Sequence, residues 1–187
     1  MKIKKLINQK YFFPIIYIIV VLGAIVLFAV NFGFYPIAVV NYTHPIMAYQ
    51  FNKSLDLSLK YYGIKNDPNA IKVFKKVVFD SLIDEVAIDA ELNKDMGFAE
   101  MDKQLNSQVN QILSDQKVQD ALSAKGISLN DAKKYFLETA IKDQMLISQL
   151  QSKGENFNQW IVDQRKGLKV FVLMRGAHWT GSEIQFD

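Results

Sequence analysis

An uninterrupted apolar run near the start of the chain places the strongest limit on its architecture. From Tyr11 to Val30 every residue is apolar, aromatic, Gly or Pro. A helix rises about 1.5 Å per residue, so this run would extend roughly 30 Å, the thickness of a bilayer core. It is longer than the core of a signal peptide, which has roughly 7–15 residues, and it lacks an A-x-A cleavage pattern. The run therefore predicts an uncleaved transmembrane signal-anchor over 11–33.

The charges beside this run predict its orientation. Residues 1–10 form a basic flank without an acidic residue, and its lysines are Lys2, Lys4, Lys5 and Lys10. No basic residue follows the run closely. By the positive-inside rule, this asymmetry predicts a cytoplasmic N-terminus and a main domain outside the cytoplasm of a bacterial-type cell membrane. The lipid bilayer would then be a partner of residues 11–33.

The composition of the remaining chain excludes several classes of site. The 187 residues carry 22 Lys and Arg against 19 Asp and Glu, a formal net charge of +3. The basic flank accounts for the whole excess, so the rest is nearly neutral and no nucleic-acid partner is predicted. Cysteine is absent and only His44 and His178 are histidines. This excludes disulfide frameworks, thiolate metal sites and histidine-rich metal centres, and neither a metal nor a cofactor is expected.

Residues 37–174 predict a mainly α domain. The clearest helix start is Asp67-Pro68, an N-cap acid followed by Pro at the first helical position, and Gly97 is placed to end that helix. Its apolar stripe is wide enough for the centre of a core. Further helices are expected at five places, which are 46–62, 99–113, 114–125, 129–150 and 157–166.

Two short apolar runs rich in β-branched residues predict a small sheet. They are Ile37–Asn41 at the start of the domain and Leu168–Met174 at its end. A strand in a helical body needs a partner, so we expect the N- and C-terminal strands of the domain to pair. The tail 175–187 contains Gly, Ser and Thr and is expected to be flexible.

The sequence contains none of the common catalytic or phosphate-binding motifs. It contains no Gly-rich phosphate loop, no G-x-S-x-G and no H-E-x-x-H. Four carboxylates, Asp80, Asp84, Glu85 and Asp89, share the expected central helix, where their spacing favours a solvated, salt-bridged face over a catalytic pair. We predict no catalytic residue.

Aromatic and methionine side chains are numerous, with 13 Phe, 8 Tyr, 2 Trp and 6 Met. Core packing explains many of them, but flexible apolar side chains also suit a permissive surface for unfolded peptide. The peptide-binding candidates, which lie near expected helix ends and junctions, are Tyr49, Phe51, Tyr61, Tyr62, Met96, Phe98 and Met101.

The order of several short motifs resembles the SurA N-terminal chaperone domain, which occurs in exported foldases of the SurA and PrsA type. The domain-opening residues Ala38–Asn41 with Pro45-Ile46 resemble the strand-turn-helix opening of that family. Val78–Glu85 is similar to its L-x-x-L-I-D-E stretch, and Leu122–Ser128 to its L-x-x-x-G-(I/L)-(S/T) junction. Trp160–Val170 resembles the returning helix and closing strand.

This resemblance implies a SurA-like helical bundle that binds unfolded or newly exported polypeptides without catalysis. Two departures limit it. Tyr42-Thr43-His44 stands where the family has Gly, and only Gln151–Asn156 stands where many members insert a parvulin isomerase domain. We therefore expect a membrane-anchored extracytoplasmic chaperone. The alternatives are an envelope adaptor with one specific partner and, least favoured, a peptidyl-prolyl isomerase; the oligomeric state stays open.

Overall fold

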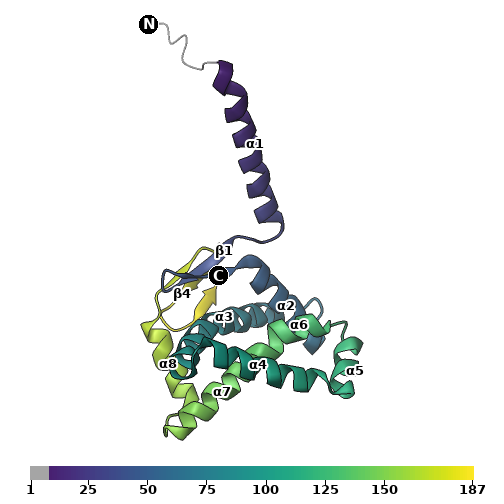
Figure 1. Cartoon of the computed structure of the whole chain (residues 1–187), viewed down its shortest axis with the longest axis vertical. Coiled ribbons are helices and arrows are strands. Elements are labelled where there is room, and N and C mark those ends of the chain that lie inside the picture. Colours follow the sequence, from purple (N-terminus) through teal and green to yellow (C-terminus); the bar gives the residue numbers. More distant parts are fainter. Residues whose placement is uncertain (1–8) are drawn as a thin grey trace.

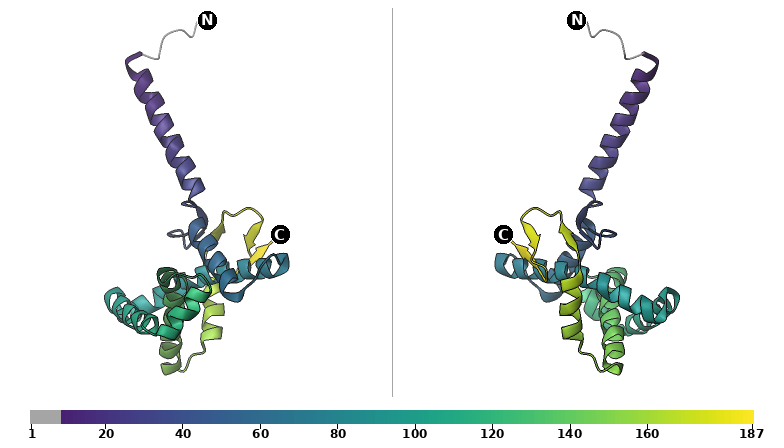
Figure 2. Two further views of the ribbon diagram at one scale, coloured as in Figure 1. Left: turned by 90° about the vertical axis from the view of Figure 1, so that its right-hand side faces the viewer. Right: turned by 90° about the vertical axis from the view of Figure 1, so that its left-hand side faces the viewer.

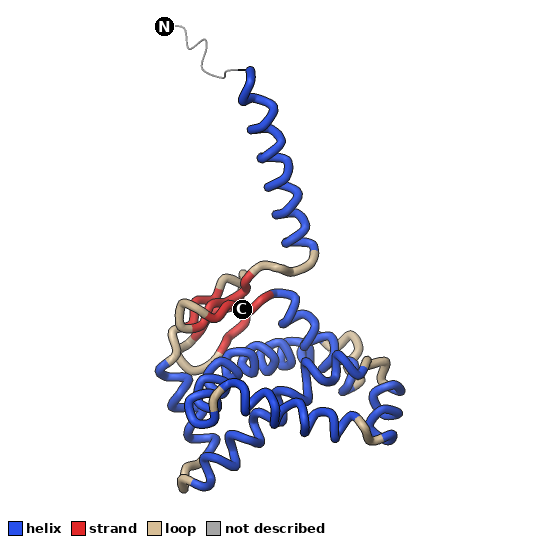
Figure 3. The backbone as a smooth tube through the Cα atoms, in the orientation of Figure 1, coloured by secondary structure: helices blue, strands red, loops and turns tan. Residues whose placement is uncertain are grey.

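The computed structural model describes the backbone of residues 9–187 and the side chains of Ile18 and of residues 20–187. Figure 3 shows that the strands gather at the end of the body nearest the first helix, whereas helices make up the rest. The elements in chain order are α1 (Gln9–Asn31), β1 (Pro36–Val40), β2 (His44–Met47), α2 (Ala48–Tyr62), α3 (Pro68–Met96), α4 (Phe98–Leu113), α5 (Gln116–Ala124), α6 (Leu129–Ala132), η1 (Lys133–Leu137), α7 (Glu138–Ser152), α8 (Phe157–Gly167), β3 (Val170–Val172), β4 (Ala177–Trp179) and β5 (Ile184–Phe186).

Helix α1 forms over the apolar run and projects away from the body (Figures 1 and 2). Within the described part of the chain, however, no helix combines the length and the hydropathy needed to cross a membrane. This finding overturns the predicted transmembrane signal-anchor over 11–33, and the predicted membrane localisation with it.

The residues predicted to set the topology belong to the start of the chain. Lys2, Lys4 and Lys5 lie outside the described residues, and so does the side chain of Lys10.

The three-stranded sheet confirms the pairing expected between the two ends of the domain. Strand β1 is central and antiparallel to both neighbours, with Ala38 opposite Ile46 of β2 and opposite Val172 of β3. The turn between β1 and β2 places Asn41 and Tyr42 at positive φ, and the Asn41 side chain accepts a hydrogen bond from the backbone N–H of Lys169 at 3.1 Å. This side chain thereby ties the turn to the start of β3.

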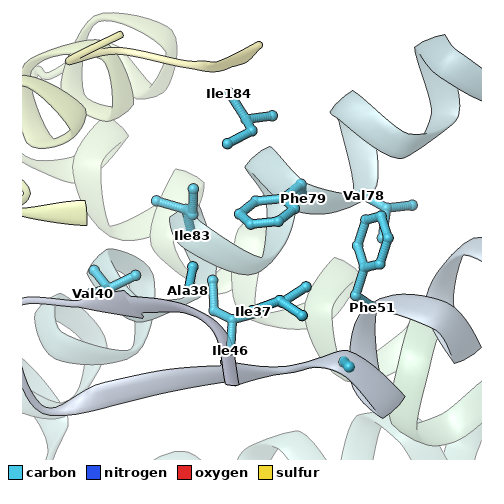
Figure 4. Packing of buried hydrophobic residues seen from close by; sticks show 10 residues of the cluster. Ile37, Ala38, Val40, Ile46, Phe51, Val78, Phe79, Ile83 and Ile184 are labelled. Carbon is cyan, nitrogen blue, oxygen red and sulfur yellow. The ribbon is translucent and has the colours of Figure 1, made fainter. Parts of the chain in front are cut away.

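Helix α3 lies at the centre of the core, as its sequence predicts. Asp67 caps it by accepting hydrogen bonds from two backbone N–H groups, and Pro68 is its first residue. The largest buried cluster joins α3 to the sheet, and its fully buried members include Phe79 and Ile83. Figure 4 shows these two side chains among Ile37 of β1, Ile46 of β2 and Ile184 of β5.

The helical end of the body has a divided core. Three smaller buried clusters replace one continuous layer: two lie among α3, α4, the η1 segment, α7 and α8, and one lies among α2, α5, α6 and the η1 segment. The helix expected over 129–150 is interrupted, because Lys133–Leu137 form a π-helical turn between α6 and α7. Such turns widen a helix locally and occur often at functional sites.

The tail expected to be flexible over 175–187 is instead a packed hairpin. Strands β4 and β5 pair with Trp179 opposite Ile184, and Ile184 is fully buried. The Ile184 backbone N–H donates to the Asp80 carboxylate at 2.9 Å, and the Lys76 ammonium lies 2.6 Å from a Glu183 carboxylate oxygen. The prediction was wrong because the apolar residues of the tail, which alternate with polar ones, find their partners on α3, more than a hundred positions away.

Candidate functional site

A groove remains open beside α3 even though the strands of the domain are paired. We call this cavity of about 680 Å³ the α3 groove. The edge strand β2, helix α3 and the start of α4 form its walls. Its lining residues are Thr43, His44, Pro45, Ile46, Gln50, Leu82, Glu85, Val86, Asp89, Ala90, Asn93, Phe98 and Met101.

A sharp turn at Gly97 places the aromatic residue of this groove. Gly97 has φ +77°, a region that glycine adopts without the clash a Cβ would cause, and it both ends α3 and begins α4. Phe98 is therefore the first residue of α4 and is 63% exposed, whereas Met101, one turn later, is only 3% exposed. The groove thus combines an exposed aromatic ring with a thioether floor.

The edge strand that borders the groove offers few backbone hydrogen bonds. Strand β2 pairs with β1 on one side only. Pro45, in its middle, has no N–H to donate, and a proline on an edge strand hinders the pairing of a further strand. A ligand in the α3 groove would therefore be held by side chains rather than by adding a strand to the sheet.

A second cavity continues the α3 groove between α2, α3 and α7. We call this cavity of about 340 Å³ the α7 pocket, and it shares Gln50, Leu82 and Glu85 with the α3 groove. The π-helical turn forms one of its walls. Its other lining residues are Ser54, Ser58, Val77, Val78, Ser81, Lys134, Tyr135, Phe136, Glu138, Thr139, Ala140 and Asp143.

The carboxylates of α3 connect it to the C-terminal elements and are more buried than a solvated face would be. Arg165 of α8 donates two hydrogen bonds to Asp84, at 2.6 and 2.5 Å. Lys142 of α7 lies 2.9 Å from Glu85 and 2.8 Å from Asp89, with only 12% of its side chain exposed. Burial lowers the pKa of Lys142, but the two carboxylates outweigh it and the pKa is raised overall. Glu85 and Asp89 are thereby fixed along the wall of the α3 groove.

Asp143 differs from these carboxylates because no cation is bound to it among the described residues. Burial, together with the negative charges of Asp84 and Glu85, raises the pKa of Asp143 from 3.8 to about 6. Its side chain lines the α7 pocket. The pocket therefore contains a carboxyl group that gains or loses its charge just below neutral pH.

The structure brings together only some of the predicted peptide-binding residues. Phe98 and Met101 line the α3 groove. Tyr49 is half-buried against Phe34, and Met96 packs in the cluster around Leu92. The remaining three lie elsewhere on α2, namely Phe51, which is buried against Phe79, and Tyr61 and Tyr62, which are exposed at the end of that helix.

Several lining residues escape recognition from the sequence alone. Pro45 and His44 belong to a predicted turn, Ala90 belongs to the apolar stripe predicted for the core, and Asn93 looks like an ordinary polar position of a helix. The residues around Asp143 in the sequence do not indicate its raised pKa either, because the negative charges that raise it belong to Asp84 and Glu85 of α3. In the described part of the chain, no three or more His, Asp or Glu side chains are arranged to hold a metal ion.

The chain matches no known family model, and neither a characterised protein nor a solved structure is significantly similar to it.

Proposed function

We propose that this protein is a non-catalytic, chaperone-like protein that binds unfolded polypeptide segments in the α3 groove. The observation that carries the proposal is the open groove itself, which keeps an exposed phenyl ring and a methionine floor beside the paired sheet. Such a surface gives shallow apolar contacts that accept many sequences.

The geometry of the groove favours weak and permissive binding. Phe98 can cover an apolar side chain of a bound segment, and Met101 can adapt its shape to that side chain from below. Pro45 removes a backbone donor from the bordering strand, so the segment need not adopt a fixed strand register. Specificity would then depend on side-chain size and charge rather than on backbone hydrogen bonds.

The charge beside the groove adds a preference for basic segments. Glu85 and Asp89 stand along its wall, and Asp143, which has no bound cation among the described residues, lies in the adjoining α7 pocket. Lys142 neutralises part of this charge, and Lys134 adds one cation at the pocket. A lysine or arginine flanking an apolar residue would find a carboxylate within the same surface.

The motif order that resembles the SurA N-terminal domain supports the same proposal, since that domain acts on unfolded polypeptides. Isomerase activity is not part of the proposal, because only Gln151–Asn156 stands where a parvulin domain would be inserted. The protein would hold its clients without changing a covalent bond or a proline isomer.

Suppression of aggregation by the full-length chain tests the proposal. We expect the wild-type chain to slow the aggregation of a chemically unfolded client, and Phe98→Ala to weaken this effect several-fold. Phe171→Ala is the matched control, because Phe171 is also an exposed phenylalanine but lies on β3 and does not line the groove. No suppression by the wild type, or an equal loss in both variants, would contradict the proposal.

Crosslinking in cells distinguishes the proposal from its main alternative. A photoreactive residue at position 98 should capture many unrelated polypeptides if the groove is permissive. Capture of one dominant partner would instead favour an adaptor protein.

A further inference from the structure

A separate groove lies where α2, the start of α3 and the C-terminal hairpin meet. We call this cavity of about 910 Å³ the hairpin groove, and it shares no lining residue with the α3 groove or the α7 pocket. Strand β5 packs against α3 (Figure 1). Phe186 and Asp187 at the end of the hairpin line one side of the groove. The groove exists only because the tail is folded.

We infer that the hairpin groove binds an acidic apolar polypeptide segment, in which an Asp or Glu flanks a large apolar side chain. This inference rests on the proposed function and adds to it a second subsite with the opposite charge preference.

The floor of the hairpin groove supplies apolar contacts for the large apolar side chain of such a segment. It is formed by Phe51 and Leu55 of α2, Ile71 of α3, and Met174 and Phe186 from the C-terminal part of the chain. Phe79 supports this floor from below, with ring centroids 5.5 Å from Phe51 and 6.2 Å from Phe186. A firm aromatic base with one methionine suits a single large apolar side chain.

The rim of the groove supplies positive charges for the Asp or Glu of such a segment. Lys72, Lys75 and Arg175 surround the floor, and Asp187 is the only acidic residue among the described residues that line it. The Lys72 ammonium already donates to the Asp187 backbone carbonyl at 3.2 Å. Among the described residues, Lys75 and Arg175 form no ion pair and no side-chain hydrogen bond, so both are available to a carboxylate.

Two side-chain amides complete the set of donors. Asn52 and Asn66 line the same groove, and an amide N–H₂ can share a carboxylate with a neighbouring ammonium or guanidinium group. A bound peptide can present a carboxylate and an apolar side chain from adjacent residues, which matches the closeness of rim and floor. The open shape of the groove admits an extended chain that enters and leaves it.

Binding of labelled peptides to the full-length chain tests the inference. Three peptides share one central Phe-Leu pair and differ only in flanking Asp, Lys or Asn residues. The double variant Lys75→Gln/Arg175→Gln should weaken binding of the Asp peptide by about 5- to 10-fold and change binding of the Lys peptide less than about twofold. Lys103→Gln/Lys117→Gln is the matched control, because it removes the same charge from exposed sites on α4 and α5.

The outcomes separate this inference from the proposed function. Equal binding of the Asp peptide by wild type and the Lys75/Arg175 variant overturns the inference, even if all three peptides bind and aggregation is suppressed. Failure of every peptide to bind, together with no suppression of aggregation, overturns both. A third outcome is that laurate binds, that the double variant weakens this binding, and that the Asp peptide does not bind. The hairpin groove would then bind a small amphiphile, and the inference of a peptide ligand would be wrong.

Discussion

The α3 groove and the hairpin groove have similar apolar floors and opposite charges. The first combines one phenyl ring with one methionine and the second two phenyl rings with one methionine, but Glu85 and Asp89 flank the first, whereas Lys72, Lys75 and Arg175 surround the second. One helix contributes to both, because the N-terminal part of α3 carries the lysines and its middle carries the carboxylates. The nearly neutral charge of the domain is therefore an average over two surfaces of different sign. A permissive binder can accept basic and acidic segments alike if it provides a separate surface for each.

The largest expected effect comes from removing the aromatic side chain beneath the hairpin groove. Phe79 is fully buried and contacts both Phe51 and Phe186, so Phe79→Ala should lower the free energy of unfolding by about 3–5 kcal/mol. Urea denaturation followed by circular dichroism measures this loss. Val73→Ala, at an exposed position of the same helix, should change it by about 0.5 kcal/mol or less.

The same variant tests whether the two grooves are independent. Phe79 contacts the floor residues Phe51 and Phe186 of the hairpin groove directly. Of the α3 groove, it shares a buried cluster with Ile46 but not with Met101. At a temperature where Phe79→Ala is still folded, binding of the Asp peptide should therefore fall more than binding of the Lys peptide. An equal fall for both peptides would show that the grooves form one energetic unit.

A smaller effect is expected from Asp143, whose carboxyl group has no cation bound to it in the part of the chain that the structure describes. Its folded-state pKa of about 6 lies above the ordinary 3.8, so the folded protein holds this proton more firmly than the unfolded chain does. The contribution of Asp143 to stability is therefore full below about pH 4, falls as the pH rises to about 6, and is then constant. Above that pH the ionised group destabilises the fold.

Asp143→Asn removes this dependence. The variant should be more stable than the wild type by about 1 to 2 kcal/mol at pH 7, after allowance for solvent screening, and the difference should vanish near pH 4. Urea unfolding at several pH values measures it, with the exposed Asp102→Asn of α4 as the control. A gain that is equal at pH 4 and pH 7 would show that packing, rather than charge, produces the effect.

The scaffold of both grooves follows from local signals in the sequence. Asp67-Pro68 and Gly97 mark the ends of α3, and the two β-branched runs at the ends of the domain predict the paired strands. These features depend on capping, backbone preference and periodicity, which act within a few residues. They account for most of the helices and for the central sheet.

The sites depend on contacts that no local signal encodes. Ile184 becomes a core residue only because Phe79 and Asp80 of α3 receive it, and without that packing the hairpin groove does not exist. The π-helical turn interrupts a helix whose periodicity is otherwise regular. Candidates chosen by residue type alone therefore include Phe98 and Met101 but miss Lys75 and Arg175, which matter through their position beside an apolar floor.

The smallest expected effect separates the two grooves by their response to salt. The Debye length falls from about 10 Å at 0.1 M to about 3 Å at 1 M, so exposed charges are screened more strongly than half-buried ones. The cations of the hairpin groove lie at its open rim, whereas Asp143 is half-buried among Asp84 and Glu85. Raising NaCl from 0.1 to 1 M should therefore reduce the preference for the Asp peptide over the Asn peptide by about two- to fourfold. The pH dependence removed by Asp143→Asn should change less over the same range.

Fluorescence anisotropy and urea unfolding measure the two responses in the same buffers. An equal reduction of the Asp-peptide preference and of the pH dependence would show that the charges of the two surfaces are equally exposed to solvent. The contrast between an exposed basic rim and a half-buried acidic pocket would then be wrong.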